Sequence, residues 1–322
     1  TRRSSSAASD VYKRQVIASL VGTDAVLDEA DRALIKGFLI NKFRGDTTLF
    51  AEGMTIVERA TGWQGVGILP WFPQARFLPA EDILDIRGKS GDARDGAPVR
   101  IAVPVLRRIA NFDDLDPLAG ETDVDVTLVE AGDVIPADVD LILLPGSKST
   151  ISDLTFLRDQ GWDIDIAAHL RRGGMVMGLC GGYQMLGTKL DDPDGVEGPA
   201  GDTLGLGHLR VETVLAGDKR LTQVTAHANA FDVPVRGYEI HMGRTGGPDC
   251  DRPFLTLDGR PEGAVSDDGA VIGTYLHGIF ADDGFRRAFL DSLAARRGRE
   301  GAFGEVDFDA RVDATLDLSL IH

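Results

Sequence analysis

The chain has 322 residues, of which 43% are hydrophobic and 26% charged, a composition typical of a globular protein with about two domains. Its formal net charge of −17 argues against a nucleic-acid-binding protein, which needs a basic surface to meet the phosphate backbone. No apolar run approaches the roughly 18 residues that a membrane-spanning helix needs, and no secretory signal pattern is visible.

The N-terminal quarter of the chain is predicted to form an α/β unit. Residues 1–15 are polar and serine-rich, which predicts a disordered or non-native extension. From Val16 to about Ile86, helical and strand patterns alternate. The predicted elements are a helix at Glu29–Ile35, a buried strand at Gly37–Phe43, a helix near Phe50–Thr61 and a strand at Gly65–Leu69. A segment rich in glycine and charge, Arg87–Pro98, predicts an interdomain linker.

A second α/β unit begins at Val99. Its predicted strands are Arg100–Val105, Asp125–Val129, Leu141–Leu144 and Met175–Gly178, with helices at Ser149–Arg158 and Ile164–Arg172. Alternation of apolar strands with helices favours a parallel sheet covered on both faces. Beyond Gly187 the pattern is richer in strands, and the predicted elements are strands at Gly207–Leu215, Tyr238–His241 and Val271–Tyr275 and a helix at Asp283–Arg297. The last five residues, 318–322, fit no pattern.

The segment Pro145-Gly146-Ser147-Lys148-Ser149-Thr150 follows an apolar strand and imitates a phosphate-binding P-loop. The match fails because Ser147, not glycine, precedes the lysine. One interpretation is a strand-end loop whose N–H groups face a developing oxyanion. The other is a simple strand-to-helix turn with Ser149 or Thr150 as the helix cap.

Cys180 stands at a tight turn between an apolar strand and a helix, in the run Gly178-Leu179-Cys180-Gly181-Gly182. The glycines permit a sharp turn, and the helix N-terminus favours a thiolate. These are the surroundings of a cysteine nucleophile. A lone cysteine after an apolar strand is more often a small core residue, but the glycine setting favours the nucleophile here.

Two later segments carry histidines at strand ends. His277 ends the strand in Gly-Thr-Tyr-Leu-His-Gly, where parallel sheets build their sites. Such a histidine can take a proton from Cys180 and return it to a leaving amine, although a structural histidine is the alternative. In the second segment, Tyr238–Met242, alternation places Glu239 and His241 on the same strand face.

Neither a disulfide framework nor a metal site is expected. The two cysteines, Cys180 and Cys250, form no CxxC pair, and the six histidines show no HxxxH or HExxH spacing. The cysteine usage predicts a reducing, cytoplasmic setting.

Together these segments resemble the class I, or triad, glutamine amidotransferases, and among them the cobyric acid synthase family, which amidates carboxylates of the corrin ring in cobalamin biosynthesis. The resemblance rests on six ordered segments: IKGFLINKFRGD at 35–46, RIAVPVLRRIANFDDLDPL at 100–118, PGSKST at 145–150, GLCGGYQMLG at 178–187, YEIHMGRT at 238–245 and GTYLHGIF at 273–280. It implies an α/β fold in which an amidotransferase domain with a parallel or mixed sheet, residues 98–317, follows a partial P-loop-type synthetase (amidoligase) domain, residues 16–90.

The resemblance also implies roles for individual residues. Cys180 would attack the glutamine amide and form a γ-glutamyl thioester, with His277 as general base and acid. The backbone N–H groups of Gly146 and Gly181 would hold the oxyanion. The ammonia released would amidate the b, d, e and g carboxylates of a cobyrinic acid a,c-diamide-type corrin at a site that uses ATP and Mg²⁺.

The sequence departs from the wider family in two places. Many class I amidotransferases carry Glu two residues after the catalytic histidine, where this chain has Ile279, so the third catalytic group is open. Glu239 and His241 are candidates for orienting or substrate roles. No GxxxxGK[ST] segment exists, so the chain is expected to be a fragment with an incomplete ATP site, in which Asn41 is a candidate for nucleotide contact.

Three alternatives remain open at this point. The related cobyrinate a,c-diamide synthases perform the same chemistry on fewer carboxylates, and YEIHMGRT favours the cobyric acid synthases by resemblance. A non-catalytic amidotransferase-like module would not need the intact motifs around Cys180 and His277. A cysteine hydrolase without a synthetase partner would not need the synthetase-like segment at 35–46.

Overall fold

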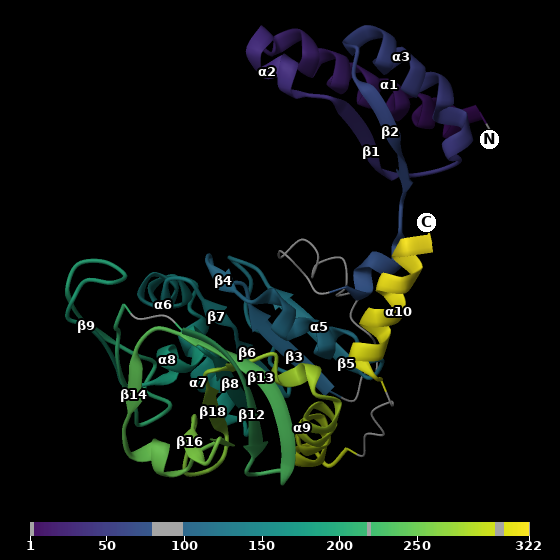
Figure 1. Ribbon diagram of the computed structural model, residues 1–322. Helices are drawn as coiled ribbons and strands as arrows, with labels where there is room; N and C mark the ends of the chain where they lie inside the picture. The colour runs from purple at the N-terminus through teal and green to yellow at the C-terminus, as the bar shows by residue number, and fades with distance from the viewer. Residues whose placement is uncertain (1–2, 79–98, 218–219, 300–305, 322) are drawn as a thin grey trace. The chain divides into compact units, whose positions relative to one another are not determined.

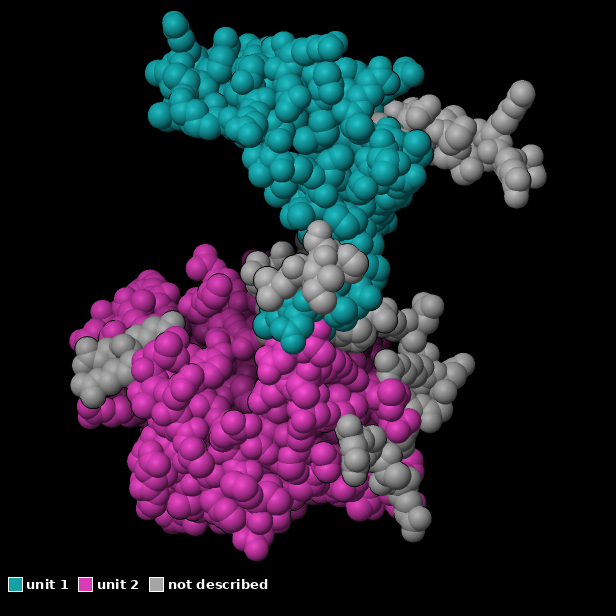
Figure 2. All heavy atoms as spheres, turned by 45° about the vertical axis from the view of Figure 1, so that its right-hand side comes forward, with its two compact units in different colours: residues 1–75, 315–322 teal, residues 76–314 magenta. Residues whose placement is uncertain are grey.

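The computed structural model describes residues 3–78, 99–217, 220–299 and 306–321. The predicted linker Arg87–Pro98 lies outside these residues. The chain divides into two compact units, Thr1–Ala75 with Thr315–His322, and Arg76–Ala314, each of which is described by itself (Figure 2).

The first unit is a small α/β arrangement with one parallel strand pair (Figure 1). Its elements are α1 (Arg3–Val26), α2 (Glu29–Leu34), β1 (Gly37–Phe43), a 3-10 helix (Thr47–Phe50), α3 (Ala51–Thr61) and β2 (Gln64–Pro70). The buried residues that hold it together are Phe38, Ile40, Phe43, Phe50, Val57 and Trp63. The two strands and two of the helices lie where the sequence predicts them.

Helix α1 corrects one prediction. The sequence predicts a disordered or non-native extension over residues 1–15, and α1 differs from the disordered alternative because it is helical from Arg3 onward. Val16, Ile17 and Leu20 pack against the core of the unit and so anchor the helix. Adding turns to an existing helix is much easier than nucleating one, and the preceding Ala, Lys, Arg and Gln residues have good helix propensity.

The second unit is built around a six-stranded sheet in the order β17-β18-β8-β6-β3-β5. All neighbours pair in parallel except β17 with β18. The strands are β3 (Val99–Pro104), β5 (Val124–Val129), β6 (Leu141–Leu144), β8 (Met175–Leu179), β17 (Ala264–Val265) and β18 (Val271–Thr274). The predicted α/β class with a parallel or mixed sheet is therefore confirmed.

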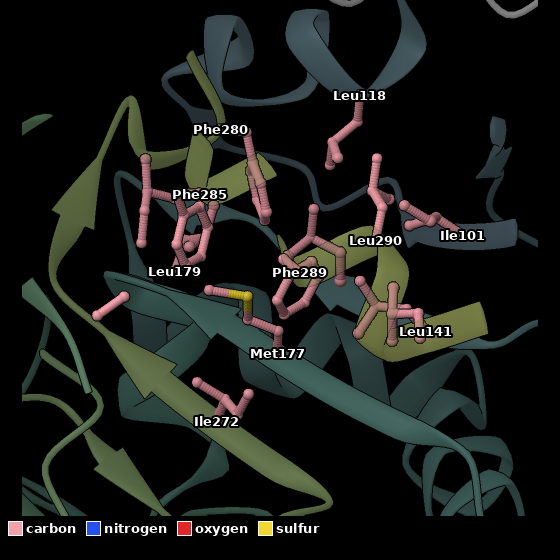
Figure 3. Packing of buried hydrophobic residues seen from close by; sticks show 14 of the residues in the cluster. Ile101, Leu118, Leu141, Met177, Leu179, Ile272, Phe280, Phe285, Phe289 and Leu290 are labelled. Carbon is pink, nitrogen blue, oxygen red and sulfur yellow. The ribbon is translucent and has the colours of Figure 1, made fainter. Parts of the chain in front are cut away.

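Alternate side chains of this sheet belong to two hydrophobic cores, one on each face of the sheet. Ile101, Leu141 and Met177 point to one face, where they meet the aromatic side chains of α9 (Asp283–Arg296), as Figure 3 shows. Ala102 and Ile142 point to the other face, under the helices α6 (Thr150–Asp159), α7 (Trp162–Arg171) and α8 (Gly181–Leu186). Burial on both faces explains why these strands are uniformly apolar.

Two further sheets lie in the strand-rich part of the unit. An antiparallel sheet has the order β16-β15-β12-β13-β19, and a mixed sheet has the order β10-β9-β11-β14. Their strands are β9 (Lys189–Asp192), β10 (Gly201–Leu204), β11 (Glu212–Val214), β12 (Arg220–Ala228), β13 (Val233–His241), β14 (Arg244–Gly246), β15 (Leu255–Leu257), β16 (Arg260–Glu262) and β19 (Leu276–His277). The strand predicted at Gly207–Leu215 is shorter in the structure, where only Glu212–Val214 is β11.

Short elements complete the second unit. They are β4 (Ile109–Ala110), α5 (Asp116–Ala119), β7 (Gly146–Ser147) and 3-10 helices at Phe112–Leu115, Pro248–Asp251 and Ile279–Ala281. The helix α10 (Phe308–Ile321) belongs to the second unit up to Ala314 and to the first unit from Thr315. A further 3-10 helix, Pro73–Phe77, spans the division between the units. β4 pairs with β7, which ties the segment after β3 to the loop after β6. In the described part of the chain no helix is long and apolar enough to cross a membrane.

Candidate active site

Cys180 occupies the turn between β8 and α8, as the sequence predicts. Its φ of 51° and ψ of −107° are unusual for a non-glycine residue and mark a strained turn. The turn is fixed at both ends, since the Cys180 N–H donates to Thr274 O at 2.8 Å and its carbonyl accepts from the Gln184 N–H at 3.0 Å. Strain at a cysteine between a strand and a helix is typical of a nucleophile presented to a substrate.

The glycines beside Cys180 are required by close backbone approach. A Cβ on Gly178 would lie 2.5 Å from the Gly182 carbonyl carbon, and one on Gly182 would lie 2.3 Å from Leu144 O. A Cβ on Gly181 would lie 2.9 Å from Ser147 N. All three contacts are closer than real Cβ atoms allow, so these positions exclude any side chain.

His277 is held by a buried carboxylate that the sequence did not single out. Its Nδ1 lies 2.6 Å from Oδ2 of Asp114, and the other oxygen of Asp114 accepts the Gly278 N–H at 2.6 Å. Both side chains are about 1% exposed. The carboxylate therefore fixes the orientation of the imidazole and selects the tautomer with a proton on Nδ1.

The same carboxylate keeps His277 protonated. Burial alone lowers the pKa of the ring, but the charge and hydrogen bond of Asp114, together with the nearby Cys180, raise the pKa of His277 to about 10. Its Nε2 is buried and has no hydrogen-bond partner of ordinary geometry within the described residues. Nε2 is thus available to a reacting group, and the ring is cationic at neutral pH.

A second layer of contacts supports the His277 ring. Tyr238 stacks against it, with ring centroids 5.5 Å apart and planes 19° from parallel. The Tyr238 hydroxyl accepts from Asn111 Nδ2 at 2.5 Å and donates to Asp113 at 3.3 Å. Burial raises the pKa of Asp113, and the adjacent Asp114 adds to that rise. The ring is therefore packed as well as hydrogen-bonded in place.

The loop after β6 approaches both catalytic candidates. A Cβ on Gly146 would lie 3.0 Å from Cε1 of His277, and the Gly181 position is pressed against Ser147. The Ser147 hydroxyl donates to Asp153 at 2.6 Å and accepts the Ser149 N–H at 3.0 Å, which fixes the loop. The structure thus places Gly146 and Gly181, the predicted oxyanion donors, on the two backbone segments that flank the site.

Glu239 and His241 lie beside a separate hollow of about 370 Å³. Glu239 forms an ion pair with Arg260. The His241 ring stacks on Tyr275 with centroids 3.8 Å apart, and burial lowers its pKa. Cys180 Sγ lies 3.6 Å from the Ile240 carbonyl oxygen, between these two residues. They are near Cys180, but Asp114, and not either of them, binds His277 Nδ1.

Asn41 belongs to the first unit and lies at the exposed end of β1. Its side-chain oxygen accepts the N–H of Lys42 at 2.8 Å, a local contact typical of strand ends. In the residues that the structure describes, no group of three or more His, Cys, Asp or Glu side chains is arranged to hold a metal ion.

The comparisons with known proteins agree with this geometry. The family model of the CobB/CobQ-like glutamine amidotransferase domain matches residues 100–285, which include Cys180, His277 and Asp114. The chain belongs to this amidotransferase family. Sequence reasoning missed Asp114 because it lies 163 positions from His277. The available signal was the acidic pair Asp113-Asp114, which lies between Phe112 and Leu115 in the segment after the first strand of the sheet.

Relatives of the amidotransferase family match nearly the whole chain. The cobyric acid synthase of Cereibacter sphaeroides is 54% identical over 315 residues, which cover 98% of this chain and 63% of the relative. The cobyric acid synthase of Rhodobacter capsulatus is 57% identical over 309 residues, which cover 96% of this chain and 63% of the relative. The chain therefore spans somewhat under two thirds of the length of these relatives.

Solved structures give a weaker likeness. The structure of PurLQS from Thermotoga maritima is 20% identical to the chain with a TM-score of 0.47, and the match covers 61% of this chain and 99% of the other. A TM-score below 0.5 adds nothing to the family assignment.

Proposed function

We propose that the second unit hydrolyses glutamine through a Cys180–His277–Asp114 triad and releases ammonia. The observation that carries the proposal is the buried 2.6 Å contact between His277 Nδ1 and Asp114. Cys180, which occupies a strained turn, also raises the pKa of the same ring. A carboxylate, an imidazole and an activated sulfur in this order are the parts of nucleophilic acyl transfer.

The chemistry follows from the charges of the three groups. Because His277 is cationic at neutral pH, it stabilises a thiolate on Cys180, which attacks the side-chain amide carbon of glutamine. His277 then gives its Nε2 proton to the leaving nitrogen, and ammonia departs as a γ-glutamyl thioester forms. The neutral ring next accepts a proton from water, which attacks the thioester, and glutamate and the free thiolate result.

The N–H groups of Gly146 and Gly181 are the proposed donors to the oxyanion of the tetrahedral intermediate. The support for this role is their position, since Gly181 lies close to Ser147 and Gly146 lies close to the His277 ring. Fixed backbone donors stabilise developing charge without reorganisation, and one such donor contributes about 10²–10³-fold to kcat in acyl transfer.

We further propose that the ammonia amidates corrin side-chain carboxylates, as the name of the cobyric acid synthase relatives suggests. Residues 16–90 would then be the end of an amidoligase domain and residues 98–317 the amidotransferase domain. No GxxxxGK[ST] segment is present in the sequence. ATP and Mg²⁺ are therefore assigned to the full-length enzyme, and none of the steps above uses them.

The two cysteines are free thiols, which supports a cytoplasmic setting.

Glutamate release from glutamine tests the proposal. We expect slow but measurable release by the chain and a loss of about 10⁴-fold or more in Cys180→Ala, because the thiolate forms the intermediate. Cys250→Ala is the matched control, since Cys250 is the second free thiol and lies outside the triad. Equal release by the unsubstituted chain and Cys180→Ala would refute the nucleophile assignment and favour a non-catalytic module.

A further inference from the structure

Helix α6 carries a buried carboxyl group that the proposed triad does not use. Asp153, in the first turns of the helix, is fully buried, and burial raises its pKa. Its Oδ2 accepts two hydrogen bonds, from the Ser147 hydroxyl at 2.6 Å and from the Arg108 N–H at 3.3 Å. Its Oδ1 is buried without a partner among the described residues. A carboxyl group in these surroundings costs stability, which favours a role that an apolar side chain could not perform.

The two contacts of Asp153 connect segments that flank the proposed site. Arg108 lies in the segment after β3, and Ser147 follows Gly146, a proposed oxyanion donor, in β7. The same segments are also joined directly, since the Lys148 N–H donates to the Arg108 carbonyl oxygen at 2.8 Å. One oxygen atom of Asp153 therefore holds both segments against α6.

The loop that Asp153 holds lies against the turn that carries Cys180. A Cβ on Gly181 would lie 2.9 Å from the nitrogen of Ser147 and 3.2 Å from Oγ1 of Thr150. Thr150, the first residue of α6, also donates to the side-chain oxygen of Gln184 in α8 at 3.0 Å. Because the loop and the start of α6 both contact the segment after Cys180, a shift of Ser147 would change the backbone beside the thiol.

We propose that Asp153 is a positioning residue, which holds the loop of Gly146 and Ser147 where its backbone can stabilise the oxyanion. This inference rests on the proposed glutaminase function. A fixed donor stabilises developing charge only at the correct distance, and a misplacement of about 1 Å can lower a rate by about 10²-fold. Since the oxyanion forms only during the reaction, Asp153 should affect kcat more than KM.

Steady-state glutamate release by variants of the full chain tests this role. Asp153→Ala should lower kcat by about 10- to 100-fold and change KM by less than about threefold, because the reacting groups remain and only the loop is released. Asp153→Asn should restore most of kcat, because its amide oxygen can accept both hydrogen bonds of Oδ2. A kcat of Asp153→Ala within about twofold of the parent value, or a change in KM alone, would overturn the proposal.

Asp165→Ala is the matched control. Asp165 lies in the first turn of the neighbouring helix α7, and its carboxylate accepts the Ile135 N–H at 3.1 Å. It therefore also connects a helix to a preceding segment, but to one that carries no residue of the proposed site. The control should keep kcat within about twofold of the parent value. An equal loss in Asp153→Ala and Asp165→Ala would assign the effect to the fold in general and would overturn the positioning role.

Ser147→Ala removes the contact from the other side. It leaves the carboxyl group in place, so it tests the contact even where Asp153→Ala folds poorly, and kcat should again fall about tenfold or more. Because the two side chains act through one contact, Asp153→Ala/Ser147→Ala should lose little more kcat than Asp153→Ala alone. Losses that multiply in the double variant would show that Asp153 acts independently of the loop, against the proposal.

Amide hydrogen exchange separates this inference from the proposed function. The N–H groups of Lys148 and Ser149 are hydrogen-bonded inside the held segments. Their exchange should become about tenfold or more faster in Asp153→Ala and stay unchanged in Asp165→Ala. Unchanged exchange in Asp153→Ala would refute the positioning role whatever happens to glutamate release. Glutamate release that does not depend on Cys180 would instead refute the proposed function, and the exchange rates would still decide whether Asp153 holds the loop.

Discussion

Asp114 raises the pKa of His277 and should therefore set the pH range of the proposed triad. With Asp114→Asn, the charge that raises the pKa of His277 is lost, while burial of the ring still lowers it. The cationic ring should then lose its proton at lower pH. We expect glutamate release at pH 8 to fall about 10²–10⁴-fold and the alkaline limb of the pH–rate profile to move toward neutral pH.

The neighbouring carboxylate supplies a matched control for this experiment. Asp113 accepts from Tyr238 and does not bind the imidazole, so Asp113→Asn should change the rate by less than about tenfold and leave the limb in place. Equal effects of the two substitutions would show that the acidic pair acts through the fold of its 3-10 helix and not through His277.

Local pattern is enough to single out two of the three residues of the proposed triad. Cys180 and His277 each lie at a strand end beside glycines, so a short segment carries the signal. Asp114 carries no such signal, because its role is created by a contact across 163 positions of sequence. A buried carboxylate near a histidine can be expected from chemistry, but only the fold selects which carboxylate it is.

At the scale of elements, the turn between β8 and α8 depends on contact between backbones. Gly182→Ala would place a Cβ 2.3 Å from Leu144 O in the adjacent strand, where neither backbone can yield. We expect the free energy of unfolding to fall by about 2 kcal/mol or more, measured by urea denaturation. Gly284→Ala is the control, since its Cβ would meet only Asp282 Oδ1 at 3.4 Å and alanine favours the helix. A similar loss in both variants would contradict this account.

Elements were predictable wherever burial alone determines the pattern. The predicted strand at Leu141–Leu144 coincides with β6, because a strand covered on both faces is a continuous apolar run. Two-residue strands such as β4 and β7 exist only through pairing with each other, and no pattern in either segment reveals it. The helix at residues 3–15 also carries no pattern of its own. It continues from the following turns of α1, where Val16, Ile17 and Leu20 pack against the core.

At the scale of the whole molecule, two buried groups make the protein less stable as the pH rises. Burial raises the pKa of Glu262 to about 7, above its ordinary value of 4.5, so its contribution to stability is lost between about pH 4.5 and 7. The pKa of His277, raised to about 10 from 6.5, adds a contribution that is present below pH 6.5 and lost as the pH rises through 10. The free energy of unfolding should therefore decline from pH 5 to pH 10.

Repulsion within a chain of net charge −17 also grows with pH, and salt distinguishes it from the buried groups. At 0.5 M NaCl the surface contribution should be largely screened, whereas the loss due to Glu262 should remain. The Tyr275 N–H donates to Oε1 of Glu262 and the Thr274 hydroxyl donates to Oε2. Glu262→Gln keeps the size and one of these two acceptor oxygens, and its NH2 group replaces the O–H of the protonated carboxyl. In urea denaturation, the free energy of unfolding of this variant should equal that of the unsubstituted chain at pH 5. At pH 8 it should be higher by about 3 kcal/mol, which is the free energy that corresponds to the pKa shift of Glu262. The assignment fails if high salt removes the whole decline, or if the variant keeps the slope between pH 5 and 7, because either result would place the titrating groups on the surface.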